Sequence, residues 1–230
     1  MSFGNTAESL ARRKYLARGE KAVSERTFNL IIGLVLTWGF LMNWLMVTAF
    51  GRQIAVWASN VNPFLYLIGY FVLVFAGNAL IAQPGPLLSF IGYNMIAVPI
   101  GVVLCMALVG VDPEIIRTSV LLTGIITVSF MIAAILIPGF FLRMGRVISL
   151  ALLIALIGEV ITMFFSRRGF MFEWIFAGIF GMYIGYDWAR ANTCAYTVNN
   201  AIDLSACLYL DIINLFLRIL SIVMRKNDRD

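Results

Sequence analysis

The sequence predicts an all-α membrane protein with seven transmembrane helices, the seventh central and surrounded by the other six. Of its 230 residues, 61% are hydrophobic and only 13% are charged, a more apolar composition than that of an average soluble domain. Apolar segments of about 20 residues recur along the chain, the length a helix needs to cross some 30 Å of hydrocarbon. Polar side chains inside the last segment need hydrogen-bonding partners that lipid cannot supply, so we expect the other helices to enclose that helix.

The expected spans are 28–50, 63–82, 87–110, 118–138, 147–165, 169–187 and 204–224. Breaks rich in proline and glycine separate several of them, at 83–86, 112–113 and 138–139. Two longer connections are expected at 51–62 and 188–203. Pro99 falls inside the third span, where it should kink the helix.

These spans form one transmembrane domain, 28–224, between a basic tail at 1–27 and a polar carboxyl-terminal tail at 225–230. The first tail carries six arginine and lysine residues and lacks the apolar core of a signal peptide. By the positive-inside rule it should lie in the cytoplasm. Seven spans would then place the carboxyl terminus outside, although its own basic residues argue for the opposite side. We expect a multi-pass protein of the cell membrane.

Composition also excludes several kinds of site. The chain contains no histidine, which removes histidine metal sites, histidine-assisted nucleophiles and imidazole pH switches. Its three cysteines (Cys105, Cys194 and Cys207) are odd in number and do not suggest a disulfide framework. The net charge of +5 comes mainly from basic residues in tails and loops, so it fits membrane topology and anionic lipid, and we expect no nucleic-acid binding. No cofactor is expected.

The most informative residues are two aspartates within the last two apolar spans, Asp187 and Asp211. A carboxylate at membrane depth costs about 2.5 to 3.5 kcal/mol on insertion scales, so residues kept there usually contact an ion, a proton or each other. In the seventh span Asn214 and Arg218 fall within roughly 60° of Asp211 around the helix. This polar stripe predicts either a pore-lining helix or an internal pair in which Arg218 neutralises Asp211.

Two glutamates complete the set of acids in the spans. Glu173 lies about 40° from Asp187 around the sixth span, near the opposite end of that helix, and we expect it to be solvated at the membrane interface. Glu159 is deeper in the fifth span, so it should be protonated, face water or bridge to an arginine on another helix. The glycines at 178, 181 and 185 lie on the face opposite the acids and predict close helix packing.

Two neighbouring carboxylates cannot easily both ionise, so a pair formed by Asp187 and Asp211 would share one proton near neutral pH. In a chain without histidine this pair is the one credible proton sensor. When both groups are ionised, their hard oxygens also suit calcium. The sequence therefore predicts a pH-sensing pair and gate that can double as a calcium site.

Tyr186-Asp187 at the end of one span, and residues 208–217 (LYLDIINLFL) in the last, resemble the transmembrane Bax-inhibitor-motif family, bacterial type. The resemblance also covers the span count, the basic amino-terminal tail and the spacing of the aspartates. It implies a proton-regulated calcium leak, a last helix wrapped by the other six, and Asp187 and Asp211 as the pH-sensing pair.

The chain departs from the family in two places. Trp188-Ala189 stands where the family often shows Thr-Gln after the first motif aspartate. No basic residue occurs between Arg52 and Arg117, which leaves Arg190 and Arg218 as the candidate cations for locking the pair.

We therefore expect a pH-regulated calcium leak channel or transporter whose partners are calcium ions, protons, the lipid bilayer and a membrane protein. The first alternative is a non-conducting regulator that binds a membrane protease or channel. An intramembrane aspartyl protease is a weaker alternative, because such enzymes resemble Gly-x-Gly-Asp at the second aspartate and need a later Pro-Ala-Leu turn. This chain has Leu208-Tyr209-Leu210-Asp211, and its last proline is Pro138. We expect no enzymatic activity.

Overall fold

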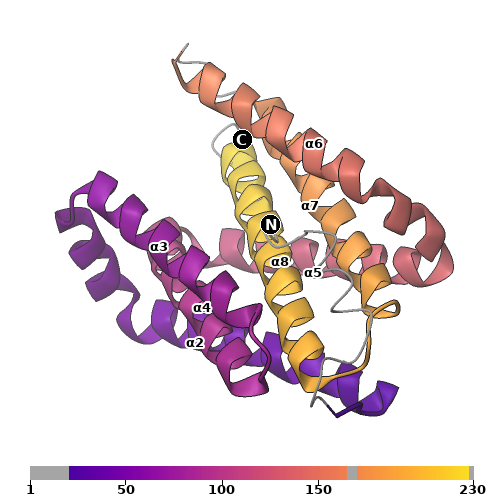
Figure 1. Cartoon of the computed structure of the whole chain (residues 1–230). Helices are drawn as coiled ribbons and strands as arrows, with labels where there is room; N and C mark the ends of the chain where they lie inside the picture. The colour runs from indigo at the N-terminus through magenta and orange to yellow at the C-terminus, as the bar shows by residue number, and fades with distance from the viewer. Residues whose placement is uncertain (1–20, 165–169, 228–230) are drawn as a thin grey trace. The chain divides into compact units, whose positions relative to one another are not determined.

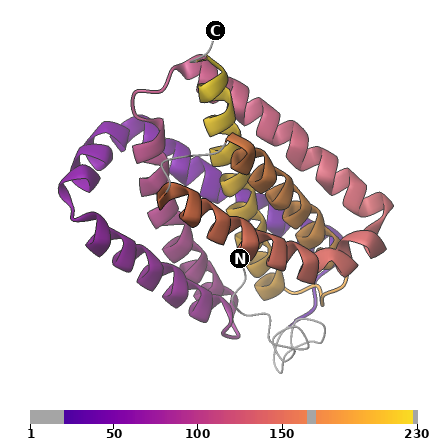
Figure 2. The ribbon, with the colours of Figure 1, turned by 90° about the horizontal axis from the view of Figure 1, so that it is seen from above.

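A computed structural model describes residues 21–164 and 170–227 of the chain. Within these ranges the regular structure consists of seven helices, and the only β pairing is an isolated bridge between Ala22 and Thr197 (Figures 1 and 2). The helices are α2 (Glu25–Asn60), α3 (Pro63–Ile81), α4 (Pro86–Leu108), α5 (Pro113–Leu136), α6 (Pro138–Phe164), α7 (Phe170–Ala191) and α8 (Val198–Asn227). The all-helical prediction is confirmed.

Short polar side chains and prolines begin several of these helices. Ser24 caps α2 by accepting a hydrogen bond from the Thr27 amide at 3.1 Å. Asn62 and Asp112 do the same for α3 and α5, and each is followed by a proline at the first helical position. A side-chain oxygen satisfies an amide that has no partner within the helix, and the fixed φ of proline suits that first position.

Three predicted boundaries are wrong. Helix α2 continues through the expected connection 51–62 as far as Asn60, and α8 begins at Val198 rather than 204. Helix α6 begins at Pro138, so Arg143 and Arg146 are helical rather than part of a loop. Hydropathy marks where a chain crosses hydrocarbon, whereas a helix continues through polar residues of good propensity until a breaker such as Asn62-Pro63 ends it.

Six helices are long and apolar enough to cross a membrane among the described residues: α2, α3, α4, α5, the Pro138–Glu159 part of α6, and α8. The chain is therefore a multi-pass membrane protein by the length and composition of its helices. Helix α7 has 22 residues but is not among the six; it carries Glu173, Asp187 and Arg190. Its role as a seventh span stays a prediction.

The chain divides into two compact units. The first unit comprises residues up to Val111 together with Thr193–Tyr209, and the second comprises Asp112–Asn192 together with the residues from Leu210 onward. Helix α8 is continuous and contributes its first part to one unit and its remainder to the other. That α8 is enclosed by six others stays a prediction. The expected tails 1–27 and 225–230 lie largely outside the described residues.

In the first unit α4 packs against α2 and α3. Gly77 and Gly92 let α3 and α4 approach closely, because a Cβ on Gly77 would lie 2.7 Å from the Gly92 carbonyl oxygen. The buried Tyr93 hydroxyl donates to the Val35 carbonyl at 3.0 Å. Asn43 on α2 donates to the Tyr209 hydroxyl, so this buried amide joins two helices, as expected of a polar residue in a span.

In the second unit α7 packs against α5 and α6 (Figure 1). A side chain on Gly181 would overlap the ring of Phe130, and one on Gly185 would overlap the ring of Phe141. The packing role predicted for these two glycines is confirmed, whereas a Cβ on Gly178 would meet no atom within 4 Å. The glycine face of α7 thus lies on α5 and α6, which leaves the acidic face for α8.

Candidate functional site: an aspartate pair and a charged cluster

Asp187 and Asp211 come together in the second unit. Their carboxyl groups lie within hydrogen-bonding reach of each other, with exposed fractions of 5% and 1%. Asp187 lies near the end of α7, and Asp211 lies near the middle of α8. We call these two residues the aspartate pair. Their approach agrees with the sequence-based expectation.

One arginine stands beside the aspartate pair. Arg190 Nη2 lies 3.3 Å from Asp187 Oδ1, and the side chain is buried. The two residues are three positions apart on α7, the spacing that puts neighbours on one helix face. The guanidinium also lies over the Tyr186 ring, 5.7 Å from its centroid. Of the two candidate cations, Arg190 is therefore the one at the pair.

One oxygen of the aspartate pair has no partner among the described residues. Asp211 Oδ2 is buried and has no hydrogen-bond partner within the described parts of the chain. A buried carboxylate oxygen without a partner is unfavourable by several kcal/mol if it stays charged. Asp187 therefore has a cation partner in Arg190, whereas Asp211 has an oxygen that these contacts leave unsatisfied.

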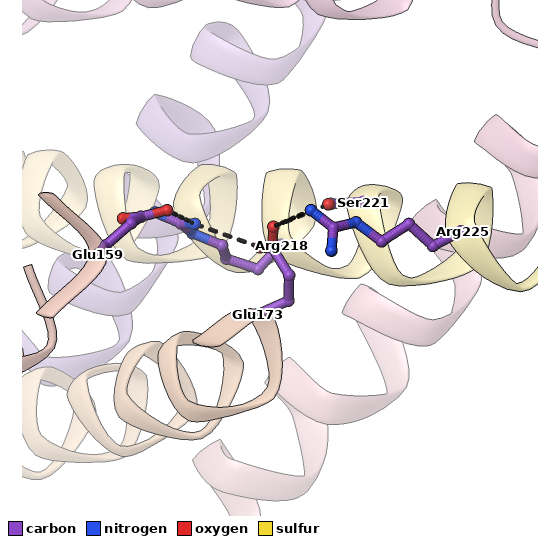
Figure 3. A network of polar contacts seen from close by, with 5 residues as sticks. All are labelled: Glu159, Glu173, Arg218, Ser221 and Arg225. Atoms are coloured by element: carbon purple, nitrogen blue, oxygen red, sulfur yellow. Dashed lines mark hydrogen bonds and ion pairs between the residues drawn. The ribbon is translucent and has the colours of Figure 1, made fainter. Parts of the chain in front are cut away.

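Arg218 belongs to a second group of charges, on a different part of α8. Its Nη1 lies 2.8 Å from Glu159 Oε1 and its Nη2 lies 3.1 Å from Glu159 Oε2 (Figure 3). Nη1 also lies 3.2 Å from Glu173 Oε2. The guanidinium carbon is 4.0 Å from the centroid of the Phe176 ring. The alternative in which Arg218 neutralises Asp211 is wrong, because Arg218 binds the two glutamates.

Glu173 has further partners on α8. Its Oε1 accepts a hydrogen bond from Ser221 Oγ at 2.9 Å and lies 3.7 Å from Arg225 Nη2 (Figure 3). The expectation that Glu173 is solvated is wrong, because long side chains from α8 cover it. Of the alternatives for Glu159, the arginine bridge from another helix is the observed one. We call Glu159, Glu173, Arg218, Ser221 and Arg225 the charged cluster.

Other polar residues satisfy their own helices. Asn214, predicted as part of the polar stripe, donates to the Leu210 carbonyl at 2.7 Å. Thr123 donates to the Ser119 carbonyl at 2.7 Å. Such bonds to the preceding turn remove the need for a partner on another helix. Neither residue joins the aspartate pair or the charged cluster.

Sequence reasoning missed three polar residues on α8. Ser221 and Arg225 belong to the charged cluster, and Asp203 is buried two turns before Asp211. The missed signal is a spacing of seven residues, because 211, 218 and 225 recur every two turns on one helix face. The polar stripe predicted from the sequence ends at Arg218.

No group of three or more acidic or cysteine side chains close enough to hold a metal ion occurs among the residues that the structure describes. The aspartate pair offers carboxylate oxygens from two residues, the kind of ligand that calcium prefers. Calcium binding by Asp187 and Asp211 stays a prediction.

Comparison with known proteins identifies the family. The chain matches the family described as inhibitor of apoptosis-promoting Bax1 over residues 20–229. It is 33% identical over 92 residues to uncharacterized proteins from Helicobacter pylori strains 26695 and J99, an alignment that covers 38% of this chain and 38% of each relative. The chain thus matches little more than a third of those relatives' length. No solved structure matches. Because the family match extends over nearly the whole sequence, the chain belongs to the Bax inhibitor family.

Proposed function

We propose that the protein is a pH-regulated calcium leak channel or transporter, gated by the aspartate pair. One observation carries the proposal: two buried carboxyl groups lie within hydrogen-bonding reach of each other beside Arg190, and one of their oxygens has no partner in the described structure. This arrangement holds a proton at low pH and releases it as pH rises.

Release of the shared proton changes the energy of the close pair. With both groups ionised, repulsion between them amounts to a few kcal/mol at an effective dielectric constant near 20. A free-energy change of that size shifts an equilibrium between two conformations by a factor of about 10² or more. The close pair is therefore most stable at low pH and loses stability as pH rises, and the separated carboxylates become hard-oxygen ligands for calcium.

Calcium flux into proteoliposomes tests the proposal. Wild type should show a leak that changes between about pH 6 and pH 8, where coupled carboxylates share a proton. Asp211→Asn deletes one charge of the pair and should flatten that response. Glu114→Gln is the matched control, because Glu114 is an exposed acid paired with Arg117 on α5. It should keep the wild-type profile.

Two outcomes would overturn the proposal. An equal pH response in wild type and Asp211→Asn would remove the pair as the sensor. No calcium flux at any pH would favour the non-conducting regulator, in which the acids serve stability alone.

The proposal also excludes proteolysis. The second aspartate lies in Leu208-Tyr209-Leu210-Asp211, without the glycines that resemble those of intramembrane aspartyl proteases. We expect purified protein to cleave no membrane peptide at acidic or neutral pH. Cleavage that is lost in both Asp187→Asn and Asp211→Asn would contradict this.

A further inference from the structure

The charged cluster and the aspartate pair lie at different levels along α7 and α8. Arg218 follows Asp211 by seven residues, a rise of about 10 Å along α8. Arg225 follows by fourteen, a rise of about 21 Å. The cluster is therefore a separate feature of the second unit, and the gating proposal does not use it.

The two levels match in register. Glu173 and Asp187 are fourteen residues apart on α7, and Asp211 and Arg225 are fourteen residues apart on α8. The contacts pair Asp187 with Asp211 at one level and Glu173 with Arg225 at the other. Two antiparallel helices can form contacts at two levels only if the contacting residues are equally far apart on both helices. A slip of α8 by one turn, about 5.4 Å, would separate both contacts.

Every carboxylate oxygen in the charged cluster has a partner, whereas Asp211 Oδ2 in the aspartate pair has none among the described residues. Two arginines face two glutamates, and three of the glutamate oxygens lie within 3.2 Å of an Arg218 nitrogen. The fourth, Glu173 Oε1, accepts from Ser221. The double contact between Arg218 and Glu159 fixes the guanidinium in a plane, the strongest geometry for such a pair. A guanidinium does not lose its proton at physiological pH.

We propose that the charged cluster is an ionic clamp that fixes the register of α8 against α6 and α7, and that the aspartate pair separates about this fixed point. Glu159 anchors the clamp to α6 and Glu173 anchors it to α7, while Arg218, Ser221 and Arg225 supply the α8 side (Figure 3). Arg218 is a positioning residue that acts through the helix on Asp211. The second half of this inference rests on the proposed gate; the first does not.

Spin-label distances test the clamp without any flux measurement. Labels at Met171 and Lys226 suit the purpose, because both side chains are exposed and lie within two residues of Glu173 and Arg225. The full chain carries both labels in a background whose three native cysteines are replaced. In lipid vesicles, the otherwise wild-type chain should give one narrow distance that is the same at pH 6 and pH 8. Arg218→Gln should lose the narrow distance.

Three further variants make the result decisive. Arg117→Gln removes an arginine from an exposed pair on α5 and should keep the narrow distance. Arg218→Glu combined with Glu159→Arg reverses the pair and should recover it. Arg218→Lys keeps the charge without the planar double contact, so it should broaden the distance distribution less than Arg218→Gln. If Arg218→Gln does not fold, Arg218→Lys replaces it in the test.

A narrow distance in both Arg218→Gln and Arg218→Lys, equal to that of Arg117→Gln, would overturn the clamp. A wild-type distance that changes between pH 6 and pH 8 would show that this level moves with the pair, and would overturn the fixed point. In proteoliposomes, Arg218→Gln should displace the pH at which flux is half-maximal, although Asp187, Asp211, Arg190 and Tyr183 around the pair are unchanged. Absence of calcium flux in wild type would contradict the gating proposal, but the spin-label distances would still test the ionic clamp.

Discussion

The aspartate pair and the charged cluster both consist of arginines and acids, but they differ in whether every carboxyl oxygen has a partner. At the pair, one arginine faces two buried carboxyl groups, and one carboxyl oxygen has no partner within the described residues. In the cluster, two arginines face two glutamates and every carboxylate oxygen is bound. The oxygen without a partner is the feature on which the proposed response to pH rests. The charged cluster, with all four carboxylate oxygens bound, is the one proposed to hold the helices together.

The largest effect should come from Arg190→Gln. Its removal leaves Asp187 buried without its cation, and breaking a buried ion pair costs about 3 to 5 kcal/mol. Denaturant unfolding in detergent at pH 8 measures this loss. An unfolding free energy equal to that of wild type would contradict the assignment of a buried ion pair between Arg190 and Asp187. Arg190→Lys, which keeps the charge, should cost less.

Arg218→Gln should destabilise the protein by a smaller amount, about 2 kcal/mol, because the charged cluster is partly exposed and solvent screens it. The loss should be equal at pH 6 and pH 8, since the missing guanidinium does not titrate there. Unfolding of wild type in low and high salt provides a second reading, because screening weakens partly exposed pairs. A loss of unfolding free energy confined to high pH would show that the charged cluster also responds to pH, which would contradict the difference drawn between the cluster and the aspartate pair.

Gly185→Ala should cost about 1 to 3 kcal/mol, because an added methyl group overlaps the Phe141 ring and overpacks the contact between α7 and α6. Gly178→Ala is the matched control on the same helix. No atom lies within 4 Å of its added methyl, and alanine favours a helix over glycine by about 0.5 to 1 kcal/mol. Thermal unfolding should therefore move in opposite directions for the two variants. A shift in the same direction would contradict the packing that aims the acidic face of α7 at α8.

The smallest effect should come from Tyr183→Phe. The Tyr183 hydroxyl donates to Ser149 Oγ at 3.0 Å and ties α7 to α6 one turn before Asp187. Loss of one such bond costs about 0.5 to 1.5 kcal/mol. Unfolding midpoints should fall slightly, and the pH response of calcium flux should keep its shape. A flattened response would give Tyr183 a part in the proton exchange itself.

Much of this arrangement could be predicted from sequence. The length of the apolar segments predicted the helices, and the antiparallel course of the last two predicted the approach of Asp187 to Asp211. The same reasoning failed at Glu173 and at Arg218. Both were interpreted from their own helix alone, whereas long arginine side chains reach across to acids on other helices. The partners of Arg218 depend on how three helices pack, and nothing in local spacing encodes that.

Boundaries failed for a different reason. The hydropathy of 28–50 falls at Arg52, yet α2 continues to Asn60 because no breaker intervenes before Asn62-Pro63. One feature of α8 seen in the structure could have been predicted from the sequence alone. Asp211, Arg218 and Arg225 recur every seven residues on one face of α8, so the stripe extends beyond the apolar core of the span.

The most direct test of the central claim is whether the aspartate pair holds a proton that it loses between pH 6 and pH 8. Infrared difference spectra of the protein in lipid at these two pH values record the carbonyl band of a protonated carboxyl group. Wild type should lose such a band as pH rises, Glu114→Gln should lose the same band, and Asp211→Asn should lack it. A spectrum without a carboxyl change, or one that is the same in Asp211→Asn, would contradict the account.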